Sequence, residues 1–191
     1  MQTSYFLLLG LALGFSLTIP PGPMNAFISS QAVRSLRNGV VAGAGAMSAD
    51  AVLGAVVFLL RSSVSLTAEI RVVYLSGACV MTLYAILLLR SRRGPAGATP
   101  SSIRVYAQAL LLGIGNPFQI LWWLTAGLAF AFLGGLVLFV GLFSAIAVWI
   151  VVFPTAVHRG VQSRPQLEST VVVVATGFLL AFAAYFLYLA L

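Results

Sequence analysis

Residues 4–30 read SYFLLLGLALGFSLTIPPGPMNAFISS, a long apolar stretch interrupted by a cluster of prolines. A helix needs roughly 20 apolar residues to cross about 30 Å of hydrocarbon, and this stretch is long enough. A backbone in lipid must satisfy its own hydrogen bonds, so a helix is the expected form. The chain begins MQTSYF, without the basic residues that open a secretory signal. We therefore expect this stretch to be retained as the first membrane span.

Similar apolar stretches recur along the rest of the chain, separated by clusters of Arg, Pro or Gly. They predict six helices, at about 4–30, 39–60, 72–90, 104–132, 135–157 and 170–191. Of the 191 residues, 61% are hydrophobic and 7% are charged, whereas a soluble domain carries about a quarter charged residues. The predicted fold is therefore an all-α membrane protein, with a single transmembrane domain over residues 1–191 and no separate soluble domain.

The positive charge indicates an orientation in the membrane rather than a nucleic-acid partner. The net charge is +7, and all ten basic residues are arginines between or at the ends of apolar stretches. Eight of them flank the loops that follow the first, third and fifth helices: Arg34, Arg37, Arg90, Arg92, Arg93, Arg104, Arg159 and Arg164. Arg61 and Arg71 lie on the opposite side. Because cytoplasmic loops are rich in Arg and Lys, we expect both termini to face outward.

The chain divides into two similar halves. A loop rich in Gly, Pro and Ser at about 91–103 is expected in the cytoplasm, between half one (about 1–90) and half two (about 104–191). The first segment of each half is interrupted, and the interruptions contain Pro20, Pro21, Gly22 and Pro23 in one half and Gly113, Gly115, Asn116 and Pro117 in the other. With three helices each, the halves enter the membrane in opposite directions. This pattern predicts two inverted three-helix repeats.

The two interruptions are candidate binding sites. Proline cannot donate a backbone hydrogen bond, so we expect helices one and four to break at Pro20, Pro21, Gly22, Pro23, Gly115 and Pro117. Freed backbone groups and half-helix ends suit the carboxylate or ammonium group of a ligand. Asn25 and Asn116 lie beside the breaks and can both donate and accept. The alternative is a kink that its own Asn side chain stabilises.

Asp50 lies near the middle of the second predicted helix, where an acidic side chain costs about 2.5–3.5 kcal/mol on insertion scales. At about 100° per residue it shares a face with Gly39, Gly43, Ala46 and Gly54. Small residues let another helix approach, so the carboxyl group is expected to point into the bundle. Burial favours the protonated form, which suits proton coupling or contact with a substrate's ammonium group. The alternatives are a packing role or a place at a cavity mouth.

Other polar and aromatic residues are weaker candidates. Gln31 is expected at a solvated helix end, and His158, next to Arg159, is expected to face lipid headgroups. Three tryptophans are expected to pack rather than to stack on a ligand: Trp122, Trp123 and Trp149.

Two motifs carry a family resemblance. The sequence GPMNAFISSQAVR at 22–34, followed by glycines and Asp50, resembles the first half of LysE-type amino-acid exporters, and GNPFQILWW at 115–123 resembles their Asn-Pro motif in the fourth helix. Two positions depart from the usual pattern. Met24 separates Pro23 from Asn25, an arrangement that resembles the lysine and arginine branch, and Phe118 replaces a frequent Lys.

The resemblance implies a secondary active exporter of an amino acid or related small solute in the cytoplasmic membrane of a prokaryote, driven by protons and using alternating access. The matching positions, expected to bind substrate, are Pro23, Asn25, Asp50, Asn116 and Pro117. Asp50 is also the expected proton-coupling residue. The expected partners are the amino acid, protons and the lipid bilayer, with a homodimer possible through small-residue faces.

Other functions fit the residues less well. The wider superfamily includes divalent metal-ion exporters, but one intramembrane carboxylate neutralises such an ion poorly. A non-transporting membrane scaffold is the third possibility. An enzyme would need a paired nucleophile and base or several acids, and the single Cys79 lies in an apolar run. We therefore expect no catalytic residues, cofactor, metal site or nucleic-acid partner.

Overall fold

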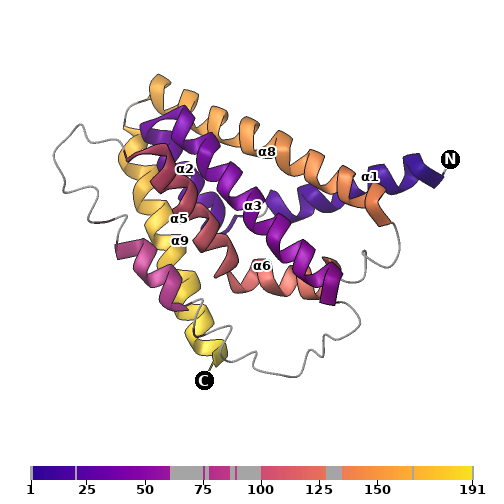
Figure 1. The fold of residues 1–191 in the computed structure, drawn as a ribbon. Coiled ribbons are helices and arrows are strands. Elements are labelled where there is room, and N and C mark those ends of the chain that lie inside the picture. Colours follow the sequence, from indigo (N-terminus) through magenta and orange to yellow (C-terminus); the bar gives the residue numbers. More distant parts are fainter. Residues whose placement is uncertain are drawn as a thin grey trace.

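The computed structural model describes residues 2–19, 21–60, 75, 78–86, 89, 100–127, 135–164 and 166–190. Throughout these ranges the elements are helices joined by short turns (Figure 1). The named elements are α1 (Gln2–Thr18), α2 (Pro23–Arg34), α3 (Leu36–Leu60), α5 (Ser102–Ile114), α6 (Pro117–Trp122), the π-helical turn η1 (Trp123–Gly127), α8 (Gly135–Ser163) and α9 (Leu167–Ala190).

Several helices are long and apolar enough to cross a membrane. Among the described residues these are Leu36–Leu59, Gly135–Ser163 and Ser169–Tyr188, and α1 and α2 form a fourth span if the bent pair counts as one. Many large apolar side chains are exposed, including Leu59, Leu136 and Tyr188, each at least 74% exposed. Such a surface suits lipid rather than water. The prediction of an all-α, multi-pass membrane protein is confirmed, and the arrangement as two inverted three-helix repeats stays a prediction.

The first and fourth predicted helices are divided. The stretch predicted at 4–30 forms α1 and α2, which are bent by 76° relative to each other. The stretch predicted at 104–132 forms α5, α6 and η1, and its residues 128–132 lie outside the described residues. For the third predicted helix, at 72–90, the described residues 78–86 are helical. The predicted loop at about 91–103 is described from Pro100 onward, and α5 already begins within it at Ser102.

α8 runs further than predicted, to Ser163 rather than to about 157, with Pro154 buried inside it. Its polar end stays helical, where Ser163 Oγ donates to Arg159 O at 2.9 Å. α1 crosses α8 so closely that a Cβ added at Gly10 would collide with the backbone carbonyl of Leu138. Glycine lets two backbones approach in this way, as is common between membrane helices.

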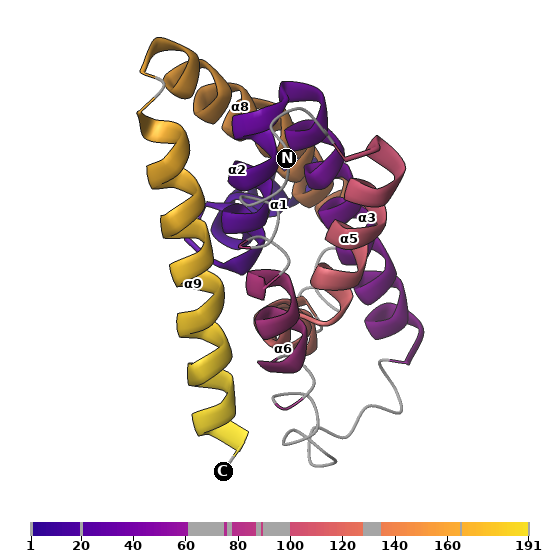
Figure 2. The ribbon, with the colours of Figure 1, turned by 90° about the vertical axis from the view of Figure 1, so that its left-hand side faces the viewer.

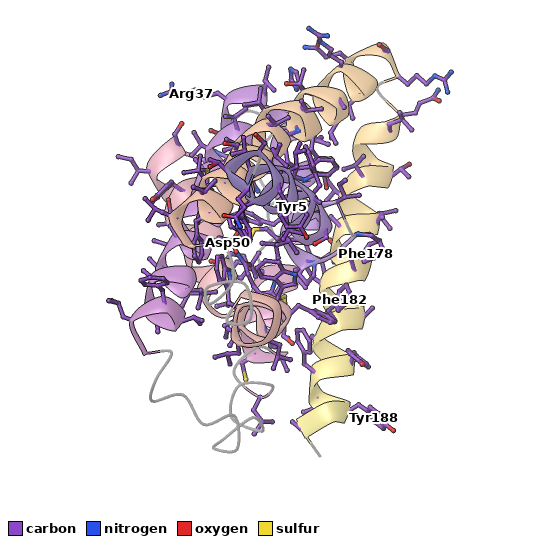
Figure 3. All side chains as sticks on the ribbon, turned by 90° about the vertical axis from the view of Figure 1, so that its right-hand side faces the viewer. Tyr5, Arg37, Asp50, Phe178, Phe182 and Tyr188 are labelled. Atoms are coloured by element: carbon purple, nitrogen blue, oxygen red, sulfur yellow. The ribbon has the colours of Figure 1, made fainter. Side chains whose placement is uncertain are left out.

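The predicted small-residue face of α3 packs against neighbouring elements. A Cβ on Gly43 would lie 2.6 Å from Ile150 Cβ on α8, and one on Gly54 would lie 2.7 Å from the Trp123 ring. Asp50, on the same face, is only 4% exposed. In Figure 3, Asp50 lies within the bundle, whereas Arg37 and Tyr188 lie at its periphery. α9 runs along one side of the molecule and packs mainly on α2 (Figure 2).

Candidate functional site

The break between α1 and α2 is built by a glycine, a proline and an asparagine. Gly22 precedes α2 in an extended conformation, and Pro23 takes the first helical position, where its missing N–H costs nothing. Asn25 Nδ2 donates to Thr18 O at 2.6 Å, and Trp149 Nε1 donates to Asn25 Oδ1 at 3.2 Å. The Asn25 side chain therefore joins the end of α1 to α2 and to α8.

The break between α5 and α6 is built from the same three residue types: glycine, asparagine and proline. Gly115 ends α5 and donates its N–H to Leu111 O at 2.9 Å. Asn116 is the N-cap of α6, with its Oδ1 accepting from the Phe118 N–H at 3.1 Å, and Pro117 again takes the first helical position. Asn116 is 5% exposed. Each break is thus stabilised in part by its own Asn side chain.

Asp50 is bonded to the second break. Gln119 Nε2 donates to Asp50 Oδ1 at 2.7 Å, and Trp123 Nε1 donates to the same oxygen at 2.9 Å. Gln119 and Trp123 are four residues apart, so both reach Asp50 from one face of the α6–η1 segment. The other carboxyl oxygen, Oδ2, takes part in neither bond. Both donors thus come from half two, and the acid comes from half one.

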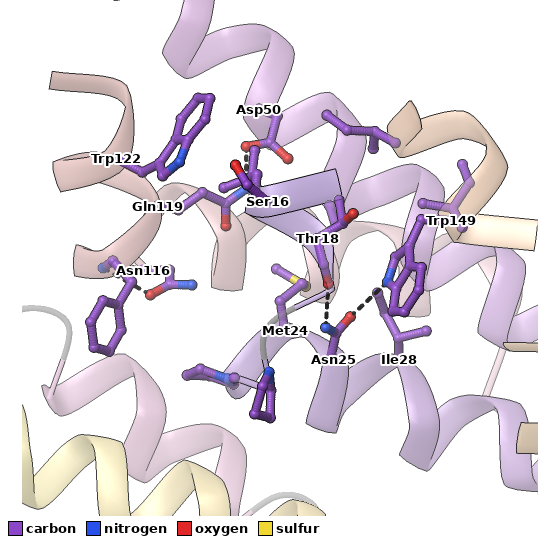
Figure 4. Close-up of a pocket in the computed structure, with 18 of the residues that line it drawn as sticks. Ser16, Thr18, Met24, Asn25, Ile28, Asp50, Asn116, Gln119, Trp122 and Trp149 are labelled. Carbon is purple, nitrogen blue, oxygen red and sulfur yellow. Dashed lines mark hydrogen bonds between the residues drawn. The ribbon is translucent and has the colours of Figure 1, made fainter. Parts of the chain in front are cut away.

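Both breaks and Asp50 border one cavity of about 290 Å³ (Figure 4). Its walls come from α1, α2, α3, α6, α8 and α9 together with the residues at the two breaks. The lining residues are Ser16, Leu17, Thr18, Pro21, Gly22, Pro23, Met24, Asn25, Ile28, Ala46, Asp50, Asn116, Phe118, Gln119, Trp122, Ile146, Trp149, Ile150 and Phe182. The cavity therefore lies where residues of both halves meet.

Most of the residues predicted to bind substrate border this cavity. The lining includes Pro23, Asn25, Asp50 and Asn116, whereas Pro117 is buried at the start of α6 and is not part of it. The predicted break residues Pro21 and Gly22 also line the cavity, Gly115 ends α5 outside the lining, and Pro20 lies outside the described residues.

Sequence reasoning missed two features of the site. Gln119 was not a candidate, although its spacing of four from Trp123 and its place directly after the Asn-Pro pair were a usable signal. Packing was expected for all three tryptophans. Trp123 is 1% exposed and stacks on Phe139, as a packing residue would, but Trp122 and Trp149 line the cavity.

One expectation about a helix end was wrong. Gln31 is 5% exposed rather than solvated, and its Oε1 is buried without a hydrogen-bond partner among the described residues. The reason is that α2 packs against α3, α8 and α9 along its length, so its end is not at the surface. His158 is half-buried, with its Nδ1 2.7 Å from Ala32 O and its Nε2 3.0 Å from Gln162 Nε2, and its place beside lipid headgroups stays a prediction.

The lining of the cavity combines one acidic side chain with several amide side chains. Across the ranges that the structure describes, no three His, Cys, Asp or Glu side chains gather in a group that could hold a metal ion. The cavity is lined by the carboxyl group of Asp50, by the start of α2, and by the amide side chains of Asn25, Asn116 and Gln119. These groups are suited to an ammonium group and a carboxylate.

Comparison with known proteins gives the family of the chain. The chain is 30% identical over 124 residues to the "Putative amino acid efflux protein YcgF" of Bacillus subtilis (strain 168), an alignment that covers 60% of this chain and 58% of that protein. No solved structure matches the chain significantly. The family model described as LysE type translocator matches residues 15–190, nearly the whole chain. The chain therefore belongs to the LysE-type translocator family.

Proposed function

We propose that this protein exports an amino acid from the cytoplasm and that the cavity between the two helix breaks is its substrate site. The observation that carries the proposal is that residues of both breaks and Asp50 line the same cavity of about 290 Å³. Family membership and the efflux name of the Bacillus subtilis relative support the direction of transport. The aligned region spans 58% of that relative, so its transport activity is extended to this chain by proposal.

The substrate's charged ends have complementary groups in the cavity. The ammonium group binds Asp50 through Oδ2, while Gln119 and Trp123 hold Oδ1. The carboxylate binds at the start of α2, where first-turn N–H groups have no carbonyl partner inside the helix, and at the amide nitrogen of Asn116. The Asn116 oxygen is engaged by Phe118 N–H, which leaves its nitrogen as the donor.

The origin of the cavity walls in both halves supports a mechanism of alternating access. Half one supplies Asp50 and the first break, and half two supplies the second break and the donors to Asp50. Rocking of the halves, as inverted repeats within six helices, would open the cavity to each side in turn. Asp50 releases a proton inward when substrate binds and takes one from outside when substrate leaves. The protein then works in the cytoplasmic membrane of a prokaryote, with both termini outside.

Counterflow in proteoliposomes tests the proposal. The purified protein is reconstituted, each of the twenty amino acids, Mn²⁺ and Cd²⁺ is loaded separately, and a pH gradient is imposed. We expect amino-acid flux driven by the pH gradient, and we expect Asp50→Asn to abolish this gradient-driven flux. Ser144→Ala is the matched control, because this exposed hydroxyl bonds only to Val140 O on its own helix among the described residues. Asp50→Glu tests whether the carboxyl group itself is needed.

The outcomes separate the competing functions. Flux of metal ions without amino-acid flux would favour a metal exporter, and no flux of any solute would favour a scaffold. Gradient-driven flux that keeps the wild-type pH dependence in Asp50→Asn would refute the coupling role of Asp50 while leaving export standing.

A further inference from the structure

One wall of the cavity is apolar and comes from three helices. α8 contributes Ile146, Trp149 and Ile150, which are spaced by three and four residues and so share one face. Leu17 of α1 and Ile28 of α2 line the same cavity. These side chains carry no charge, and their one polar group, the Trp149 N–H, already donates to Asn25. They therefore provide no partner for a polar ligand. This wall offers contact area to an apolar group.

The polar side chains at the first break are already engaged by the protein. Ser16 Oγ donates to Leu13 O at 2.7 Å, and Thr18 Oγ1 donates to Gly14 O at 2.9 Å, each within α1. Asn25 bonds to Thr18 O through its nitrogen and to Trp149 through its oxygen. The hydroxyl protons of Ser16 and Thr18 are therefore used within α1, and the Asn25 side chain is used to hold the break.

The remaining polar groups match the backbone of one amino acid. Asp50 Oδ2 provides a charged acceptor, Asn116 Nδ2 provides a donor, and the start of α2 provides a partial positive charge. Among the described residues of the lining, Asp50 is the ionisable one. These three groups match the ammonium and carboxylate of a zwitterion, and the amide nitrogen of Gln119, which also lines the cavity, already donates to Asp50 Oδ1. A second charge on the side chain would have to be buried against the apolar wall.

We infer that the substrate is an amino acid with an uncharged, apolar side chain, such as leucine, isoleucine, valine, methionine or phenylalanine. The inference rests on the proposed function and names its substrate class. Lysine or arginine would need a second carboxylate, and glutamate would need a second cation, to offset the cost of burying the extra charge. The Met24 insertion, which resembles the lysine and arginine branch, therefore does not decide the substrate. The cavity volume of about 290 Å³ is near the low end of the range for ligand pockets, roughly 300–1,000 Å³. This size suits a single amino acid.

A competition assay tests the inference without any variant. Proteoliposomes are loaded with labelled leucine, and exchange is measured against unlabelled members of each chemical class. We expect apolar amino acids to compete at least about 10-fold better than lysine, arginine, glutamate or aspartate, since pocket contacts discriminate at this level or better. Lysine or arginine that competes as well as leucine would overturn the inference while amino-acid export survives. The absence of flux for any amino acid would overturn both.

A variant of the apolar wall provides a second measurement. Ile150→Ala removes side-chain contact from the wall, so the preference for leucine over alanine should narrow by about 10-fold. Val152→Ala is the matched control, because Val152 is 55% exposed and lies two residues away on the same helix. A merely structural effect of Ile150→Ala would lower leucine and alanine transport equally. That equal loss, in a variant that folds, would overturn the assignment of this wall to the substrate side chain.

Discussion

Trp123 donates its indole N–H to Asp50 Oδ1 across 2.9 Å, which ties the buried acid of α3 to the first residue of the π-helical turn η1. Such turns are rare and often lie at functional sites. Gln119 donates to the same oxygen from the preceding turn of α6. Any movement of the second break relative to α3 must lengthen or break these two bonds. Under the proposed alternating access, these two bonds would have to be released in each transport cycle.

Removing one donor should weaken this connection. The Trp123 ring stacks on Phe139, with the ring centroids 6.1 Å apart and an interplanar angle of 2°. Trp123→Phe deletes the indole N–H but keeps an aromatic ring at this position. We expect a loss of about 1–2 kcal/mol in unfolding free energy, the range of a buried hydrogen bond. We also expect faster export, because one of the two bonds that transport would have to release is missing. Thermal unfolding in detergent and flux measurements check both effects, and Tyr188→Phe at an exposed site is the control. Unfolding and export at wild-type levels in Trp123→Phe would show that the bond is unimportant.

The first break should depend on the contact between Asn25 and Trp149. Asn25→Ala removes the bonds to both Thr18 O and Trp149, whereas Trp149→Phe removes only the indole N–H. If the two side chains act together, a double-mutant cycle will give a coupling of about 0.5–2 kcal/mol. Unfolding of the two single variants and the double variant measures it. Additive effects of the two substitutions would mean that the 3.2 Å bond contributes no stability.

The breaks were predictable because they depend on local backbone chemistry. Proline at the first position of a helix is a short-range signal, and the helices α2 and α6 begin at Pro23 and Pro117, the second directly after its N-cap Asn116. The buried side of α3 was predictable for a similar reason, since the spacing of Gly43, Asp50 and Gly54 fixes one helical face.

The hydrogen-bond partners of Asp50 were not predictable from spacing alone. Gln119 and Trp123 lie 69 and 73 residues away in the chain, and their approach depends on how α6 packs against α3. The burial of Gln31 has the same origin, because it depends on neighbouring helices rather than on the end of its own. The residue pattern within one helix predicts which face is buried, but it does not predict which residue of another helix contacts that face.

The crossing of α1 and α8 should be intolerant of even one methyl group. In Gly10→Ala the new Cβ collides with the Leu138 carbonyl, a backbone atom that cannot rotate away. Overpacking of this kind costs about 1–3 kcal/mol, so we expect a lower unfolding temperature in detergent. Gly177→Ala on α9 is the control, because no atom lies within 4 Å of its added Cβ. If both variants unfold like the wild type, the close contact between α1 and α8 is not made in the membrane.

The orientation of the chain can be tested by labelling single cysteines in intact cells. The native Cys79 is first replaced by serine, and cysteines are then placed at Gln2 and at Ser163, which are both exposed near helix ends. Arg-rich loops stay on the cytoplasmic side, and Ser163 lies between Arg159 and Arg164. A membrane-impermeant maleimide should therefore label Gln2→Cys from outside and should reach Ser163→Cys only after the membrane is permeabilised. The reverse pattern would place both termini inside and would invert the assignment of the arginines, because eight of the ten would then face outward.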